Sequence, residues 1–343
     1  MRVTERMSAT RISRRSIQLR LRLAVLLLAT VLVLSLTSLP TDAATATGLK
    51  AYNDAVAQVA ASASLNEVPS DSKPTLAQMG TGIYRWITPP PVKASCIAGH
   101  KDTSFNPCVY GSLNSKVKMV LLGDSQASQW AAGFMAYATA NNVQLTLLAM
   151  NGCPPWLMTF TDVGGTSFPV CDRWHTFIVN KINTMRPNYV VVTGALGEAG
   201  NKPTTAGLVK GMNALYKAIA PSKAKVAVLS NVPMYFTAPA AAPATCYSVN
   251  KTSLQSCNLT PQVAFRSTSM AGTLRAALQQ GATASKVPYI NLDPLLCTDA
   301  ICPSIIGKYL VYHDAFHLTW TFSQNLAKPL GYLVKQAIGA PSP

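Results

Sequence analysis

From residue 116 onward, short apolar runs rich in β-branched residues alternate with longer amphipathic stretches. The runs predict strands over residues 117–122, 143–149, 189–193, 226–230 and 287–292. The stretches predict helices over residues 127–139, 173–185, 206–219, 262–280 and 319–338. Strands that alternate with helices pair in parallel, and strands that are apolar throughout are covered on both faces. We therefore expect an α/β fold, a three-layer α/β/α sandwich around a five-stranded parallel sheet.

The composition indicates an ordered protein and gives no sign of a nucleic-acid partner. Of the 343 residues, 49% are hydrophobic and 12% are charged, against about 25% charged residues in an ordinary soluble domain. The net charge is +16, and residues 47–343 contribute 22 basic and 11 acidic residues to it. These charges are scattered, with no basic run interleaved with aromatic residues. The basic body suits an anionic cell envelope better than DNA or RNA.

The first 46 residues are typical of an export segment. Seven arginines precede residue 23, and an uncharged, largely apolar run follows over residues 23–39. This run is just long enough to span a bilayer, and Ala44-Thr45-Ala46 offers a cleavage site, so a retained anchor and a cleaved signal peptide both stay open. Ser13-Arg14-Arg15-Ser16-Ile17 also resembles a twin-arginine signal. Because the arginines precede the run, we expect the remaining chain outside the cytoplasm, secreted or held by one span.

Residues 47–95 are rich in alanine, serine and proline and show no sustained apolar period. They predict a tether with one short helix over residues 52–61. Residues 96–343 then form the main domain.

Eight cysteines follow residue 95. An even number outside the cytoplasm indicates disulfides, and successive cysteines lie close enough to close four local loops. The expected pairs are Cys96 with Cys108, Cys153 with Cys171, Cys246 with Cys257, and Cys297 with Cys302. A zinc site is not indicated, because no C-x-x-C occurs and no couple has a suitably spaced histidine.

The first predicted strand runs into Gly123-Asp124-Ser125 directly before a helix. In a parallel α/β sheet, reactive groups gather beyond the carboxyl ends of the strands. Gly123 permits a tight turn, and the N-terminus of the following helix directs N–H donors at any anion formed there. Ser125 is therefore a candidate nucleophile, with a simple helix cap at Asp124 or Ser125 as the alternative.

A second candidate group begins the last predicted helix, where Asp314 precedes His317 by three residues. A loop there can fold the Asp314 carboxylate onto the Nδ1–H of His317 and leave Nε2 free to take a proton from Ser125. One alternative is a helix cap made by Asp314 or Thr319. Another is a metal pair of His313 and His317, for which no third ligand is apparent nearby.

Three motifs stand in the order Gly123-Asp124-Ser125-Gln126, Asn151-Gly152-Cys153-Pro154-Pro155 and Asp314-Ala315-Phe316-His317-Leu318-Thr319. These motifs, in this order, resemble the SGNH/GDSL hydrolase superfamily. More narrowly, residues 96–338 are similar to the extracytoplasmic SGNH domain associated with acyltransferase-three proteins that O-acylate polysaccharides. The resemblance implies a flavodoxin-like α/β/α fold, an SGNH-type catalytic domain over residues 96–343, and no metal or other cofactor.

The same resemblance implies a role for each site residue. Ser125 is the nucleophile, His317 the general base and Asp314 the carboxylate that orients it. The backbone N–H groups of Ser125 and Gly152 form the oxyanion hole.

Two positions depart from the family pattern. Gln126 stands where histidine is more usual, but that histidine is not the base. The third motif should place an asparagine after the strand at residues 189–193, yet the chain reads Gly194-Ala195-Leu196-Gly197-Glu198, with no asparagine before Asn201. One missing oxyanion donor costs about 2.7 to 4 kcal/mol of transition-state stabilisation.

These features predict an exported serine-dependent acyl-ester transferase or esterase acting on O-acyl groups, most simply O-acetyl groups, of envelope polysaccharide. Water as the acceptor makes an esterase and a sugar hydroxyl makes a transferase, and the sequence does not decide between them. The alternatives are a secreted esterase or lipase for small esters and a catalytically inactive glycan-binding module. The expected partners are the glycan, a separate multi-span membrane acyltransferase for the transferase, and the membrane itself if the N-terminal segment is uncleaved.

Overall fold

The computed structural model describes residues 43–79, 93–161, 164–196, 203–235, 245–247, 250 and 253–342. The apolar run at residues 23–39, on which the expected export segment depends, lies outside these residues. Among the helices of the described residues, none has both the length and the apolar character needed to cross a bilayer.

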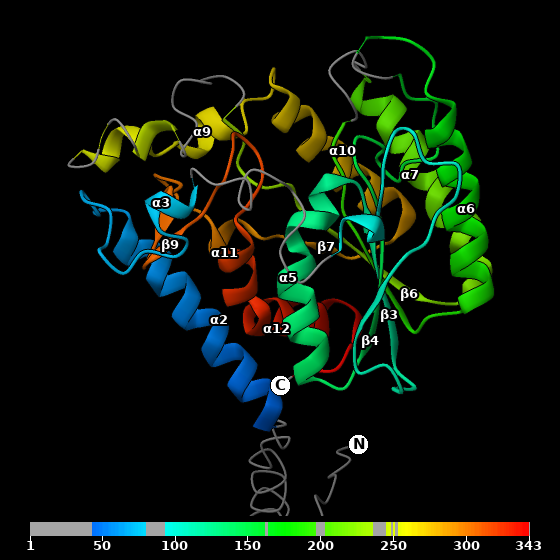
Figure 1. The fold of residues 1–343 in the computed structure, drawn as a ribbon, viewed down its shortest axis with the longest axis horizontal. Coiled ribbons are helices and arrows are strands. Elements are labelled where there is room, and N and C mark those ends of the chain that lie inside the picture. Colours follow the sequence, from blue (N-terminus) through cyan, green and yellow to red (C-terminus); the bar gives the residue numbers. More distant parts are fainter. Residues whose placement is uncertain are drawn as a thin grey trace, which may run out of the picture. The chain divides into compact units, whose positions relative to one another are not determined.

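A mostly parallel sheet forms the centre of the fold (Figure 1). Its strands are β1 (Ile97–Ala98), β2 (Val109–Gly111), β3 (Lys118–Gly123), β4 (Gln144–Met150), β5 (Tyr189–Val192), β6 (Lys225–Leu229) and β7 (Tyr289–Ile290). The order is β1-β4-β3-β5-β6-β7, and β2 pairs antiparallel with β4. The five predicted strands are β3 to β7, so the expectation of five is corrected to seven. The two additional strands have two and three residues, too few for a recognisable period.

Helices cover both faces of the sheet, as predicted. On one face lie α5 (Ser125–Ala140), α11 (Trp320–Asn325) and α12 (Ala327–Ile338), and on the other α6 (Pro169–Met185), α7 (Thr205–Ile219) and α10 (Met270–Ser285) (Figure 1). Side chains alternate along each strand, so Met119 and Leu121 of β3 join the first core while Val120 and Leu122 join the second. The structure therefore confirms the three-layer arrangement.

Two predicted helices are each divided. The stretch at residues 262–280 forms α9 (Pro261–Ala264) and α10, because the chain turns at Ser269, whose side chain caps α10 by accepting from the Gly272 N–H. The stretch at residues 319–338 is divided at Leu326 into α11 and α12. The hydrophobic period continues across both divisions and conceals them.

The expected tether at residues 47–95 is folded over residues 47–79, and this part of the prediction is corrected. Helix α2 (Ala43–Ser62) extends the predicted short helix, and α3 (Leu76–Met79) follows. The stripe of α2 that contacts the core is Tyr52, Ala55, Val56 and Val59, which is one face of a helix. Farther on, the Lys73 N–H donates to the Lys308 carbonyl at 2.8 Å. Residues 44–343 group as one compact unit; the alanine-rich composition concealed the stripe.

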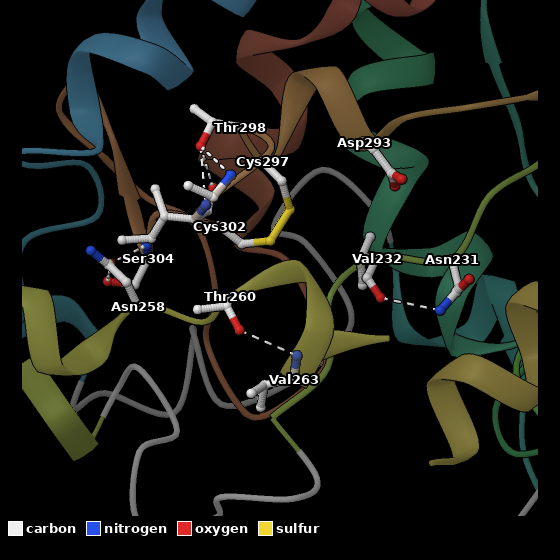
Figure 2. Close-up of a disulfide and its surroundings, with 12 residues drawn as sticks. Asn231, Val232, Asn258, Thr260, Val263, Asp293, Cys297, Thr298, Cys302 and Ser304 are labelled. Atoms are coloured by element: carbon white, nitrogen blue, oxygen red, sulfur yellow. Dashed lines mark hydrogen bonds between the residues drawn. A yellow bond between two sulfur atoms is a disulfide. The ribbon is translucent and has the colours of Figure 1, made fainter. Parts of the chain in front are cut away.

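All eight cysteines form the four expected pairs, Cys96–Cys108, Cys153–Cys171, Cys246–Cys257 and Cys297–Cys302. The last pair precedes the hairpin of β8 (Ile305–Ile306) and β9 (Tyr309–Leu310). Figure 2 shows this bridge beside Asn258 and Ser304. Asn258 Oδ1 accepts from the Ser304 N–H at 2.8 Å and from its hydroxyl at 3.0 Å. These contacts anchor the segment that leads from the sheet to His317.

Candidate active site

The turn between β3 and α5 leaves the Ser125 hydroxyl available. Asp124 is the helix cap, because its Oδ1 accepts from the Gln126 N–H at 2.8 Å. Its Oδ2 accepts from the Ala195 N–H, also at 2.8 Å. A Cβ at Gly123 would overlap the Thr193 carbonyl oxygen, so only glycine fits this turn. The cap alternative thus applies to Asp124 and leaves Ser125 for another partner.

That partner is His317. Its Nε2 lies 2.9 Å from the Ser125 Oγ, and its Nδ1 lies 2.7 Å from the Asp314 Oδ2. The Asp314 Oδ1 accepts from the N–H groups of Phe316 at 2.8 Å and His317 at 2.7 Å. The structure therefore brings together the three side chains selected from the sequence, although 192 positions separate Ser125 from His317.

The electrostatic environment favours one protonation state of the hydrogen-bonded residues Ser125, His317 and Asp314. Burial raises the pKa of the Asp314 carboxyl, but the hydrogen bond and charge of His317, aided by His313 and the Phe316 N–H, more than offset it, and the pKa falls to about 2. Asp314 is therefore ionised near neutral pH. We assign the ring proton of neutral His317 to Nδ1, facing Asp314, which leaves the Nε2 lone pair facing the Ser125 hydroxyl.

Asp124 is a buried carboxylate beside the same site. Burial raises its pKa to about 6, and the N–H groups of Ala195 and Gln126, with the charge of His317, offset only part of this effect. Its two backbone bonds join the turn that carries Ser125 to the loop after β5. Asp124 thus fixes the backbone conformation of the turn next to Ser125.

Two buried glutamines connect α5 to the backbone on both sides of His317. Gln129 Oε1 accepts from the Leu318 N–H at 2.7 Å, and Gln129 Nε2 donates to Gln126 Oε1 at 2.6 Å. Gln126 Nε2 in turn donates to the Phe316 carbonyl at 3.5 Å. The sequence marked Gln126 only as a departure from the family pattern and did not single out Gln129. Two long polar side chains at i, i+3, directly before the mostly apolar remainder of α5, were the available signal.

His313 is a second buried imidazole at this site. Its ring is parallel to that of His317 within 7°, with centroids 5.5 Å apart, and its Nδ1 lies 3.5 Å from the Asp314 Oδ2. Burial lowers its pKa to about 4, so the ring is neutral near pH 7. Asp314 thus supplies the third ligand type that the metal alternative lacked. A metal ion bound to both His317 Nδ1 and Asp314 would break their hydrogen bond, so the arrangement favours the proton-transfer chain.

Gly152 lies two residues after the end of β4. Strand β4 pairs with β3, and Ala149 of β4 lies opposite Gly123 of β3. It therefore lies at the same edge of the sheet as Ser125, and its φ of +73° is in the left-handed region that glycine favours. The neighbouring Asn151 N–H donates to the Ala98 carbonyl at 3.0 Å, which fixes this loop. The oxyanion role of Gly152 stays a prediction.

The third motif supplies no side-chain amide in its described part. Thr193, Gly194, Ala195 and Leu196 follow β5, and the Ala195 N–H is already bonded to Asp124. A Cβ at Gly194 would lie 2.7 Å from the Pro155 ring, so a larger residue does not fit there. Glu198 and Asn201 lie outside the described residues.

The sequence profile of the SGNH domain, described as fused to AT3 domains, matches residues 95–330. The chain belongs to this SGNH domain family. The match covers the three motifs and the seven strands. No curated protein matches this SGNH domain.

One solved structure shares the fold with a TM-score above 0.5, and two others are less similar. The lipopolysaccharide acetyltransferase periplasmic domain of Salmonella ser. Paratyphi A is 17% identical with a TM-score of 0.51, covering 64% of this chain and 85% of its own. A GDSL-like lipase from Bacteroides thetaiotaomicron is 15% identical with a TM-score of 0.38, covering 64% and 87%. The R55A variant of an acetyl-xylooligosaccharide esterase from Geobacillus is 9% identical with a TM-score of 0.40, covering 67% and 97%.

Proposed function

We propose that this SGNH domain transfers acyl groups through a covalent acyl-Ser125 intermediate. Family membership supports an acyl-ester hydrolase or transferase in general terms. The observation that carries the proposal is the chain from the Ser125 Oγ through His317 to an ionised Asp314, with distances of 2.9 Å and 2.7 Å.

In the first step, the Ser125 Oγ attacks the ester carbonyl carbon and its proton passes to His317 Nε2. The imidazolium that forms is stabilised by Asp314 through Nδ1–H. The carbonyl oxygen, now negative, accepts from the backbone N–H groups of Ser125 and Gly152. The carbon–oxygen bond to the leaving alcohol then breaks, and that alcohol takes the proton from Nε2.

In the second step, His317 Nε2 removes a proton from the acceptor oxygen, which attacks the carbonyl carbon of the acyl-serine. The bond from that carbon to the Ser125 Oγ then breaks, and Oγ takes the proton back from Nε2. Water as the acceptor completes ester hydrolysis, and a sugar hydroxyl completes transfer. We propose that acetyl groups are transferred to, or removed from, an envelope polysaccharide, by similarity to the Salmonella acetyltransferase domain and to the fusion with AT3 domains that the family description states. Four disulfides support a location outside the cytoplasm, with residues 1–46 as the export segment.

A transferase outside the cytoplasm needs an activated acyl donor. Because other SGNH domains are fused to AT3 domains, we propose a multi-span membrane acyltransferase as the partner that delivers the acyl group. An esterase needs no such partner.

A fluorophosphonate probe, which labels activated serines, tests the nucleophile. We expect labelling of the wild-type protein that is lost in Ser125→Ala. Ser256→Ala is the control, since the Ser256 hydroxyl is exposed and donates to the Ser253 carbonyl at 2.8 Å. A folded wild-type protein that does not react would favour the inactive glycan-binding module, which the described part of the third motif also supports.

Expression of the chain with and without a multi-span acyltransferase, in a host that lacks its own, separates the two outcomes. Glycan acetylation only with the partner supports the transferase. Ester hydrolysis in both strains without acetylation supports the esterase, and acetylation without the partner contradicts the partnership.

A further inference from the structure

Two neighbouring hollows lie between the loop after β1 and the start of α6. One is a cavity of about 230 Å³ lined by Asp102, Phe105, Asn106 and Trp174, among others. The second is a cavity of about 250 Å³ lined by His100, Phe168 and Arg173, among others. The catalytic steps described above use neither of them. We call the pair the α6 hollows.

The α6 hollows lie close to the proposed oxyanion loop. Ile97 and Gly123 pair with Ala149 of β4 from opposite sides, so the chain that enters the hollows is two strand spacings, about 10 Å, from the nucleophile turn. His100 Nε2 lies 3.1 Å from the carbonyl oxygen of Asn151, the residue before Gly152. A substrate held at Ser125 can therefore extend into the hollows.

The walls of the hollows are held in place before any ligand binds. Cys96–Cys108 closes the loop that carries Asp102 and Phe105, and Cys153–Cys171 ties the residue after Gly152 to the first turn of α6. The Asp102 Oδ2 accepts from the Gly99 N–H at 2.9 Å. The Arg173 Nη2 donates to the Asp102 carbonyl at 3.4 Å between the two hollows. Preorganised walls lower the entropy cost of binding.

The lining combines aromatic rings with hydrogen-bonding groups. Phe105 packs edge-on against Trp174 with centroids 5.1 Å apart, and His100 contacts Phe168 at 4.6 Å. The Trp174 ring is almost fully buried behind the Phe105 ring, so it forms the base of the first hollow, and the Asp102, Asn106 and Arg173 side chains supply the hydrogen-bonding groups. A sugar ring offers both apolar C–H faces and hydroxyl groups.

The size and polarity of the hollows indicate a small polar ring. Each volume is below the about 300 to 1,000 Å³ of pockets that enclose a drug-sized ligand. The carboxylate of Asp102, the amide of Asn106 and the guanidinium of Arg173 can each bond adjacent hydroxyls. A long acyl chain would instead need a continuous apolar tunnel, which these linings do not form.

We infer that the α6 hollows are subsites for sugar rings adjacent to the ring that carries the acyl ester. The inference rests on the proposed function, because it assigns the substrate of the same site to oligosaccharides of at least two or three rings. The hollows then set chain-length preference, and Ser125 performs the chemistry.

Hydrolysis of p-nitrophenyl acetate and of O-acetylated xylo- and cello-oligosaccharides of one to four rings tests this assignment. For the wild-type protein we expect kcat/KM to rise about tenfold from one ring to four. Phe105→Leu and Asn106→Ala should flatten this rise, with a much larger loss on four rings than on p-nitrophenyl acetate. Asn114→Ala is the matched control, since Asn114 is an exposed asparagine in the turn after β2, and should change neither substrate.

A binding measurement gives a second readout that needs no turnover. Addition of the four-ring compounds to Ser125→Ala should shift the NMR signal of the Trp174 indole N–H, assigned by its loss in Trp174→Phe. Equal kcat/KM for one and four rings in both series, with no shift of that signal, would overturn the subsites while p-nitrophenyl acetate hydrolysis left the proposed function intact. Loss of all hydrolysis and labelling, with the shift retained, would overturn the proposed function instead.

Discussion

Replacement of Asp314 by asparagine isolates the orienting role of the carboxylate. In the wild-type protein, Oδ1 accepts from two backbone N–H groups and Oδ2 faces His317 Nδ1 at 2.7 Å. An asparagine can keep both backbone bonds through its oxygen, so the loop should hold its shape. Its NH₂ group then faces Nδ1, and a donor in that place favours the tautomer with the proton on Nε2, which cannot accept from Ser125.

The expected loss follows from this tautomer change. The equivalent change in a serine-protease triad lowers kcat by about 10⁴, which corresponds to about 5.4 kcal/mol of transition-state stabilisation. We expect Asp314→Asn to lower kcat by about 10³ to 10⁴ with little change in KM, a smaller loss than in Ser125→Ala or His317→Ala. The thermal midpoint should change little because the backbone bonds remain.

The assay is the rate of p-nitrophenyl acetate hydrolysis together with the rate of fluorophosphonate labelling. Asp71→Asn serves as the control, since the exposed Asp71 carboxylate pairs only with Lys308 in the described residues, at 3.1 Å. If Asp314→Asn kept more than about a tenth of wild-type kcat, Asp314 would not set the tautomer of His317, and the proton-transfer chain would be rejected.

The remaining predictions concern coupling, positioning, pH and disulfides. The double variant Ser125→Ala/His317→Ala should be no slower than either single variant, because the two residues act as one unit; additive losses in steady-state rates would contradict this. Gln129→Leu, which removes a bond to the backbone beside His317, should lower kcat about 10-fold to 100-fold at constant KM, and an unchanged kcat would limit Gln129 to packing. The folded-state pKa of Asp314 is about 2, below the usual 3.8, so its ionised carboxylate stabilises the folded protein above pH 4, and this stabilisation is lost as pH falls to 2. The difference in unfolding free energy between the wild type and Asp314→Asn, measured by urea denaturation, should therefore shrink between pH 4 and pH 2. Reduction of all four disulfides should lower the thermal midpoint, since a loop of 15 residues is worth about 3 kcal/mol, and free thiols in non-reducing peptide maps would contradict the pairing.

Local pattern was sufficient for much of this fold. Each of the strands β3 to β7 has its own apolar run, and each helix beside them has its own period, so they could be predicted without knowledge of their neighbours. The cysteine pairs are also local, with separations of 5 to 18 residues. Ser125, Asp314 and His317 could be selected because each stands in a short motif next to a predicted helix.

Other features depend on contacts between distant residues and leave no local trace. Strands β1 and β2 exist because they pair with β4, and α2 extends beyond the predicted short helix because Tyr52, Ala55, Val56 and Val59 contact the core. The bond from Gln129 to Leu318 joins residues 189 positions apart, and no spacing along the chain predicts it. The same holds for Asp124, whose raised pKa results from burial and whose bond to Ala195 exists only when β3 and β5 are adjacent.

The sequence by itself determined which residue types stand at the ends of the strands, and therefore which chemistry the chain can perform. The tertiary structure decided which of those groups meet. A hydrogen bond such as the 2.9 Å contact between Ser125 and His317 depends on the sheet, two helices and a disulfide-anchored hairpin together. The shape of the α6 hollows also depends on the tertiary structure, because a cavity is the space that several packed segments leave between them.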